Sequence, residues 1–372
     1  MQPSGSTASC IRCWRQATHL NPNLRMLPSG SHKGSVSRSY YSDRCDSLRD
    51  IFGAREVRVT ESGIWVDDRT FPVIDDVIIC LEPSRWPESV RARLGSQISP
   101  ASASDAAGFA EDIQFTFGEE WGTFNAMLDE HEETFTSYFD LVDLPSLREQ
   151  RLCDLGCGMG RWSYFASEHC REIVLVDFSD AIFVARRTLS QRSNAIFVMA
   201  DVRQLPFRND FSDFIFSLGV LHHLPCPPLP EVARLRDYAP KLLIYLYYAL
   251  DNRPSYFKSV LGAVSKVRAR LSSIRNRTTR SAIVTFIALF VYIPLVALGT
   301  LARPFGLARF VPLYEGYKDQ GWTAIRQDAY DRFFTRIEHR VSRKEILEVL
   351  SGAFRRIQVS DRLPYWHFLC ER

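Results

Sequence analysis

The sequence predicts an α/β fold with a doubly wound, mostly parallel, seven-stranded sheet that ends in a β-hairpin. Short apolar runs alternate with helix-like segments between residues 151 and 250. Strands of a parallel sheet are covered on both faces and therefore read as continuous apolar runs. A helical insertion that caps the sheet and a small β-rich N-terminal module complete the predicted architecture.

Composition divides the chain into regions that we expect to behave differently. The regions are a disordered tail (1–44), a small β-rich module (45–94), a linker (95–109), a two-part α/β domain (110–251 and 315–372) and a basic, apolar helical insertion (252–314). Residues 1–42 contain no acidic residue, a composition that fits either a disordered tail or an organelle transit peptide. The cysteines form no framework, so we expect a cytoplasmic location and no metal site.

The strands and helices of the α/β domain follow one another in a regular order. The strand-like runs are RLCDL, EIVLVDFS, AIFVMAD, DFIFSLGVLHHL and KLLIYLYY, and the helix-like segments between them are RWSYFASEHC, DAIFVARRTLSQ and LPEVARLRDYA. The stretch AFRRIQVSDRLPYWHFLCER predicts the terminal hairpin, and Ser342 is expected to cap the helix before it. This alternation predicts crossover connections and a ligand site at the carboxyl ends of the strands.

A glycine-rich turn, DLGCGMG, follows the first of these strands. It does not fit the dinucleotide fingerprint, because Arg161 stands where the third glycine of GxGxxG would be. It does not fit the phosphate-binding loop either, because no Gly-Lys-Ser/Thr follows. The turn therefore argues against a dinucleotide or a nucleoside triphosphate as ligand.

The turn resembles motif I of class I S-adenosylmethionine (SAM)-dependent methyltransferases, and three further landmarks follow in the expected order. Asp177 ends the second strand, Asp201 ends the third, and GVLHHLP follows the fourth. Together they resemble the branch related to quinone-biosynthesis methyltransferases (methyltransferase type 11), over about residues 110 to 250. The resemblance implies that SAM is the cofactor and that 110–251 and 315–372 form the SAM-binding domain.

The resemblance also implies roles for individual residues. Asp177 would accept hydrogen bonds from the ribose hydroxyls, and Asp201 would meet the adenine amino group. Asp154 would meet the SAM ammonium or only order the glycine turn. Trp121, with Glu120, lies in an aromatic segment that would form a lid or an ordinary buried cluster. The expected cofactor-binding residues are Asp154, Gly156, Cys157, Gly158, Gly160, Asp177, Phe178, Asp201, Val202, Leu218 and Trp121.

Two adjacent histidines, His222 and His223, follow the fourth strand, where this family meets its acceptor. Either could act as general base, because histidine titrates near neutral pH, or both could only shape the loop. The resemblance implies methyl transfer to a small-molecule or lipid acceptor, at oxygen or carbon. An inactive SAM-binding scaffold and a macromolecule methyltransferase are the alternatives. We expect no nucleic-acid partner, and the oligomeric state stays open.

The insertion combines a basic segment with an uncharged, apolar run over 281–302. About 20 apolar residues suffice to cross a bilayer. One crossing would separate the terminal hairpin from the rest of its sheet, so the run must re-enter, lie in the interface or cover the acceptor site. Pro294, Gly299 and Pro304 are expected to break it into a bent hairpin. Two interpretations of the insertion stay open, peripheral contact with a membrane and a soluble cap over the acceptor site.

A further candidate stretch follows the insertion and contains Asp331, Glu338 and His339. It either borders the acceptor pocket or forms a solvated helix.

The N-terminal module contains FPVIDDVIICL, which resembles the YPVxDGIPxLL segment of the small zinc-ribbon-like domain that many bacterial methyltransferases carry. Asp76 stands where that segment has glycine, and the paired cysteines are missing. The departure predicts a degenerate module without metal.

Overall fold

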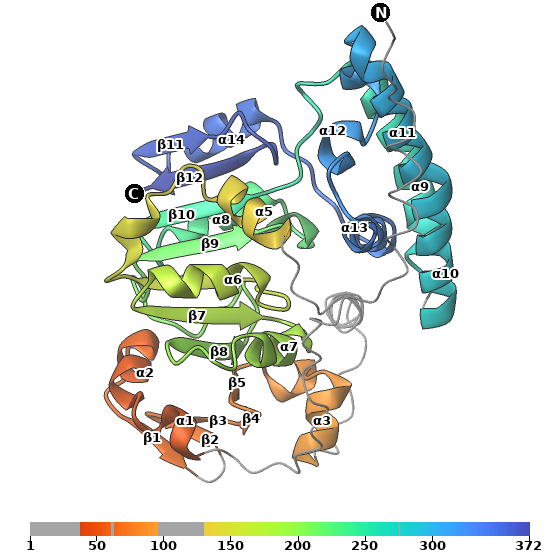
Figure 1. Ribbon diagram of the computed structural model, residues 1–372. Helices are drawn as coiled ribbons and strands as arrows, with labels where there is room; N and C mark the ends of the chain where they lie inside the picture. Colours follow the sequence, from red (N-terminus) through yellow and green to blue (C-terminus); the bar gives the residue numbers. More distant parts are fainter. Residues whose placement is uncertain (1–37, 61–62, 96–129, 275) are drawn as a thin grey trace, which may run out of the picture. The chain divides into compact units, whose positions relative to one another are not determined.

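The computed structural model describes residues 38–60, 63–95, 130–274 and 276–372 (Figure 1). The large sheet has nine strands in the order β11-β12-β10-β9-β6-β7-β8-β5-β4. Its strands are β4 (Val73–Ile74), β5 (Val77–Ile79), β6 (Arg151–Leu155), β7 (Glu172–Asp177), β8 (Ala195–Met199), β9 (Phe214–Leu218), β10 (Lys241–Tyr245), β11 (Arg356–Val359) and β12 (His367–Glu371). The strands from β10 to β5 run parallel, whereas β4, β12 and β11 pair antiparallel.

The predicted doubly wound, mostly parallel sheet with its terminal hairpin is confirmed, but the prediction of seven strands was wrong. The additional strands β4 and β5 come from the N-terminal module, and β5 pairs with β8 through Val77 opposite Phe197. Val77, Ile78 and Ile79 are all buried. Three consecutive apolar side chains can be buried together only in a strand that is covered on both faces, so this run joins the large sheet.

The rest of the N-terminal module surrounds a small antiparallel sheet. Its elements are α2 (Cys45–Phe52), β1 (Val57–Thr60), β2 (Gly63–Val66), β3 (Arg69–Phe71) and α3 (Glu88–Leu94). Helix α1 (Arg38–Ser42) precedes it, so the prediction of a tail over 1–44 was wrong for residues 38–44. The ring of Tyr41 is buried, and its hydroxyl donates to the carbonyl oxygen of Asp76 at 2.6 Å. This contact fixes α1 against the fold.

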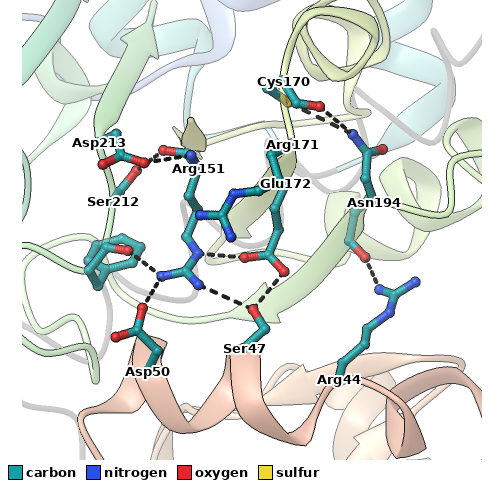
Figure 2. Close-up of polar contacts among 12 residues, drawn as sticks. Arg44, Ser47, Asp50, Arg151, Cys170, Arg171, Glu172, Asn194, Ser212 and Asp213 are labelled. Atoms are coloured by element: carbon teal, nitrogen blue, oxygen red, sulfur yellow. Dashed lines mark hydrogen bonds and ion pairs between the residues drawn. The ribbon is translucent and has the colours of Figure 1, made fainter. Parts of the chain in front are cut away.

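A buried arginine ties the module to the amino ends of the central strands (Figure 2). Arg151, the first residue of β6, donates to Asp50 of α2 at 2.6 Å and to the carbonyl oxygen of Phe211 at 2.7 Å. It also pairs with Glu172, which accepts a hydrogen bond from Ser47 of α2 at 2.6 Å. A buried guanidinium requires such partners, because an unpaired buried charge is costly. Residues 45–94 are therefore part of the same body as the large sheet.

Helices cover both faces of the large sheet (Figure 1). One apolar core packs α2, α8 and α14 against the sheet, and the other packs α3, α5, α6 and α7. Five of these helices are named here for the first time, and their ranges are α5 (Glu130–Tyr138), α6 (Arg161–Ala166), α7 (Ala181–Thr188), α8 (Pro228–Leu235) and α14 (Arg343–Leu350). Ser342 caps α14 as predicted, in a capping box with Glu345.

The insertion folds into helices with a small core of their own. The elements are α9 (Ser255–Leu271), α10 (Arg277–Ile287), a π-helical stretch (Ala288–Tyr292), α11 (Ile293–Ala302), α12 (Tyr314–Tyr317) and, after the insertion, α13 (Trp322–Phe334). Val284, Ile287 and Tyr292 pack against Ala329 and Phe333 of α13. The insertion and α13 therefore form one helical cap.

The breaks predicted at Pro294 and Gly299 were wrong, because one helix continues from Arg277 to Phe305. The π-helical stretch ends two residues before Pro294, and such a stretch lets a helix continue where a proline removes a regular hydrogen bond. Gly299 serves packing instead: a Cβ there would lie 2.2 Å from the ring of Tyr314. The helix ends beside Pro304, where a break was expected, and Gly306 follows with φ of 70°.

Candidate active site

The candidate site lies at the carboxyl ends of β6, β7, β8 and β9. The chain leaves β6 for β7 and β8 on one side and returns to β9 on the other. Ligands of doubly wound sheets bind at this kind of reversal in strand order. A cleft of about 890 Å³, its open mouth included, occupies the position. Its lining residues are Gly156, Cys157, Arg161, Trp162, Asp177, Phe178, Ser179, Asp201, Val202, Arg203, Leu218, Gly219, Val220, His223 and Leu224.

The glycine turn is packed tightly against other parts of the fold. A Cβ on Gly156 would lie 2.4 Å from the side chain of Val220, in the loop after β9. A Cβ on Gly160 would lie 2.7 Å from Leu189, and both glycines have positive φ, 80° and 78°. Glycine is therefore required at these positions by the conformation and by neighbouring protein atoms. Gly156 also lines the cleft, whereas Gly158 and Gly160 are not among its lining residues.

Asp177 holds the glycine turn and faces the cleft. One carboxylate oxygen accepts a hydrogen bond from the backbone N–H of Gly158 at 2.9 Å. The other accepts from the backbone N–H and the hydroxyl of Ser179, at 2.9 and 2.7 Å. Burial raises the pKa of Asp177, although the bonds from Ser179 oppose the rise. A carboxylate oxygen has more than one lone pair, so Asp177 can accept further hydrogen bonds from a ligand with hydroxyl groups.

Asp201 is held by two arginines, which the sequence analysis did not anticipate. Arg203, two residues further on, donates to it at 2.9 and 3.2 Å. Arg85, from the N-terminal module, pairs with the same carboxylate. Its guanidinium carbon lies 5.0 Å from the centre of the Phe178 ring. Burial alone would raise the pKa of Asp201, but hydrogen bonds from Arg203 and Arg85 hold this pKa below its ordinary value. Asp201 is therefore a charged, well-bonded group at the edge of the cleft.

Asp154 lies behind the glycine turn and is not among the residues that line the cleft. It is buried, and it accepts a hydrogen bond from the hydroxyl of Ser163 on α6 at 2.6 Å. Burial raises the pKa of Asp154 to about 7. Of the two roles considered for this residue, the geometry favours ordering of the turn and of the start of α6.

The two histidines occupy different environments. His223 lines the cleft; its Nδ1 lies 2.8 Å from the carbonyl oxygen of Ile337, and its Nε2 lies 3.6 Å from a carboxylate oxygen of Asp331. His222 is fully buried beneath it and stacks on Tyr247 at 3.9 Å between ring centroids. Neither ring nitrogen of His222 has a hydrogen-bond partner among the described residues. Burial lowers the pKa of His222 well below its ordinary value, so this ring is neutral.

Asp331 is brought to His223 by the helical cap. It lies on α13, and it accepts a hydrogen bond from the hydroxyl of Tyr247, the ring that stacks on His222. Burial raises the pKa of Tyr247 well above its ordinary value, so the hydroxyl keeps its proton. Of the other two residues considered beside the acceptor pocket, Glu338 pairs with Arg268 and Arg340, and His339 contacts the carbonyl oxygen of Leu224.

The remaining predicted residues divide between the cleft and the undescribed segments. Cys157, Phe178, Val202 and Leu218 line the cleft. The structure does not describe Glu120 and Trp121. The predicted linker over 95–109 also lies outside the described residues, except for Gly95. Sequence reasoning missed Trp162 and Arg161, whose guanidinium lies 4.5 Å above the Trp162 ring. Their position in the first turn of the helix after the glycine motif was the available signal.

No three His, Cys, Asp or Glu side chains in the described part of the chain come together as metal ligands would. The lining offers the carboxylates of Asp177 and Asp201, the guanidinium groups of Arg161 and Arg203, and apolar side chains. Arg203 is paired with Asp201, and the whole set suits a ligand that carries hydroxyl groups and a flat ring.

Comparison with known proteins identifies the class of this domain. A family model described as a methyltransferase domain matches residues 152–236. The match begins in β6 and ends just after α8, so it contains the glycine turn, Asp177, Asp201 and both histidines. Residues 152–236 therefore carry a methyltransferase domain. The relation of the N-terminal module to zinc-ribbon-like domains is not confirmed. No curated protein matches the sequence.

Several solved structures resemble the chain. YcgJ from Bacillus subtilis is 22% identical over 36% of this chain and 59% of its own, with a TM-score of 0.30. Human N-acetylserotonin methyltransferase, solved with SAM, is 14% identical over 76% of this chain and 61% of its own, with a TM-score of 0.41. The pyocyanin biosynthetic protein PhzM is 13% identical over 64% of this chain and 54% of its own, with a TM-score of 0.36. The chain thus spans less than two thirds of the length of each.

Proposed function

We propose that the protein is a SAM-dependent methyltransferase that acts on a small-molecule or lipid acceptor, at oxygen or carbon. The observation that carries the proposal is the meeting of Gly156, Asp177 and His223 around one cleft at the carboxyl edge of the sheet. Asp177 supplies a ligand-binding carboxylate there, and His223 supplies a group that can take a proton.

The lining residues fit SAM group by group. Asp177 would accept hydrogen bonds from the ribose hydroxyls, and Phe178 and Val202 would contact the adenine ring. Arg161, which lines the cleft beside the glycine turn, would meet the carboxylate of the amino-acid part. When bound, the cofactor supplies a methyl group activated by the positive sulfur. Transfer of such a methyl is an in-line displacement, so correct positioning provides much of the rate enhancement.

His223 is the better candidate for a general base. With its Nδ1 proton assigned to the hydrogen bond with the carbonyl oxygen of Ile337, the lone pair lies on Nε2, the nitrogen beside Asp331. Once Nε2 has taken a proton, the Asp331 carboxylate at 3.6 Å stabilises the imidazolium. His222 is enclosed and outside the cleft lining, so we assign it a packing role.

Binding and methyl transfer test the proposal separately. The full chain should show a rise in thermal midpoint with S-adenosylhomocysteine, because a ligand that binds only the native state stabilises it. Tritium from methyl-labelled SAM should then appear in the organic-extractable fraction of a cell extract incubated with the protein. Tritium retained in the protein or RNA pellet would show a macromolecular acceptor. Binding without any transfer would indicate a scaffold.

A further inference from the structure

The long helix of the cap exposes an apolar stripe. Phe286, Phe290, Ile293, Leu301 and Phe305 are 60, 64, 42, 72 and 77% exposed. Their spacing along the helix is four, three, eight and four residues, which places them on one face. The opposite face, with Val284, Ala288 and Tyr292, packs on α13. Soluble proteins rarely leave so continuous an apolar surface in water.

The charges around this stripe have one sign. Every charged residue between Asp251 and Glu315 is basic. Three of the basic residues have other roles, because Arg253 pairs with Glu315, Arg268 pairs with Glu338, and Arg280 is buried against Tyr330. The exposed ones are Lys258, Lys266, Arg270, Arg277, Arg303 and Arg309. An apolar face bordered by bases complements the surface of an anionic membrane.

Helix α9 adds a second apolar stripe next to the basic residues. Tyr256, Val260 and Val267 are exposed large apolar side chains at helical spacing. Lys266 and Arg270 project from the same helix and are exposed as well. Because α9 and α10 both contact α13, the two helices belong to the same helical cap. An amphipathic helix with a basic border lies in the plane of a membrane.

The sheet topology excludes a transmembrane arrangement. The helix Arg277–Phe305 is long and apolar enough to cross a bilayer by length and composition. The strand before the insertion, β10, pairs with β12, which comes after it, with Lys241 opposite Glu371. Both ends of the cap must therefore lie on the same side of any membrane. A return crossing is absent from the described residues, since no second helix there meets the criteria for a membrane span.

We propose that the helix Arg277–Phe305 and α9 dock on the surface of an anionic bilayer, with their apolar stripes at the boundary between headgroups and acyl chains. Anionic lipids are enriched in the cytoplasmic leaflet, so this surface would hold the protein at the inner face of a membrane. The docking surface is independent of the cleft, and its test does not depend on methyl transfer.

Flotation of the full chain with lipid vesicles tests the proposal. The protein should float with vesicles of phosphatidylcholine and phosphatidylglycerol at 3:1, float less with pure phosphatidylcholine, and bind the anionic vesicles less tightly in 0.5 M salt. Each basic residue near an anionic surface contributes about fivefold in binding. The variant Lys266→Glu/Arg270→Glu should therefore lose at least tenfold in affinity for the anionic vesicles. Protein that stays at the bottom in low salt with both vesicles would overturn the proposal.

The apolar stripe has a matched control. Phe290→Glu/Leu301→Glu should lose at least tenfold in affinity for the vesicles, because two exposed apolar side chains would no longer enter the bilayer. Val349→Glu/Leu363→Glu places the same two charges at exposed apolar positions outside the cap and should bind like the wild type. Circular dichroism checks that each variant is folded. If Phe290→Glu/Leu301→Glu binds vesicles normally and instead converts a dimer into a monomer in light scattering, the stripe is an interface between two copies of the chain and the proposal fails.

Discussion

The two sides of the cleft are built in different ways. On the cofactor side, Asp177 holds the glycine turn that follows the adjacent strand, and Ser179, two residues further on, bonds to Asp177. On the acceptor side, His223 faces Asp331 and contacts the carbonyl oxygen of Ile337, both more than 100 residues away in the chain. Asp177 is therefore fixed by groups less than about 20 residues away, whereas the candidate proton-transfer pair is assembled by a helix of the cap.

Substitution of His223 should have the strongest effect, and it should act on proton transfer and not on cofactor binding. For an oxygen acceptor, His223→Gln should lower kcat by about 10²- to 10⁴-fold, the usual contribution of a general base. Its affinity for S-adenosylhomocysteine should change little, because His223 lies on the acceptor side. Steady-state kinetics and calorimetry measure the two quantities. His222→Gln is the matched control. It should lower the thermal midpoint and leave kcat nearly unchanged, because it buries an amide without a hydrogen-bond partner in an enclosed contact.

The next effect concerns the pH dependence of stability on the cofactor side. Asp154 has its pKa raised to about 7 by burial, whereas an unfolded aspartate titrates near 3.9. The native state therefore binds this proton more tightly, and stability contributed by Asp154 falls as pH rises from about 4 to about 7. Asp154→Asn removes that dependence. Its free energy of unfolding, relative to wild type, should rise by about 2–4 kcal/mol between pH 4 and pH 8 in urea titrations. A difference that is constant with pH would contradict the assignment.

A somewhat smaller effect tests the ribose carboxylate. Asp177→Asn should weaken S-adenosylhomocysteine binding by about 30- to 100-fold, because hydrogen bonds to a charged acceptor contribute about 1.5–3 kcal/mol each. Calorimetry at 25 °C measures the change. Asp180→Asn is the control on the same loop, since Asp180 bonds to the hydroxyl of Ser89 at 2.5 Å and is not among the lining residues. Equal losses in both variants would show a general disturbance of the loop.

The smallest effect tests the link between the N-terminal module and the cofactor edge. Arg85→Ala removes one partner of Asp201 and leaves Arg203, so we expect a loss of about 1 kcal/mol in the free energy of unfolding. Arg93→Ala removes an exposed pair with Asp75 and a contact with the ring of Phe183, and it should have a smaller effect. Urea denaturation compares the two variants. If their losses are equal, the contact between Arg85 and Asp201 does not stabilise the module.

The sequence predicted features that depend on nearby residues. The buried apolar strands, the glycine turn and the capping box at Ser342 each follow from patterns within about ten residues. Strands β4 and β5 were assigned to the small N-terminal module and not to the large sheet, because two- and three-residue strands carry little periodicity and β5 finds its partner more than 100 residues later. The pairing of Arg85 with Asp201 was missed for the same reason. Asp331 was considered as a neighbour of the acceptor pocket, but its contact with His223 was not predicted, because it forms only through long-range packing.

The position of β12 between β10 and β11 has a consequence for the synthesis of the chain. Residues 367–371 must leave the ribosome before the large sheet can close, and the apolar helix 277–305 is made well before them. During that interval β10 lacks its partner strand while the apolar stripe of the helix is also exposed, and unpaired edges and apolar surface of this kind are prone to aggregation. Early capture of the nascent helix by a chaperone or a lipid surface would protect the chain until the last strand arrives.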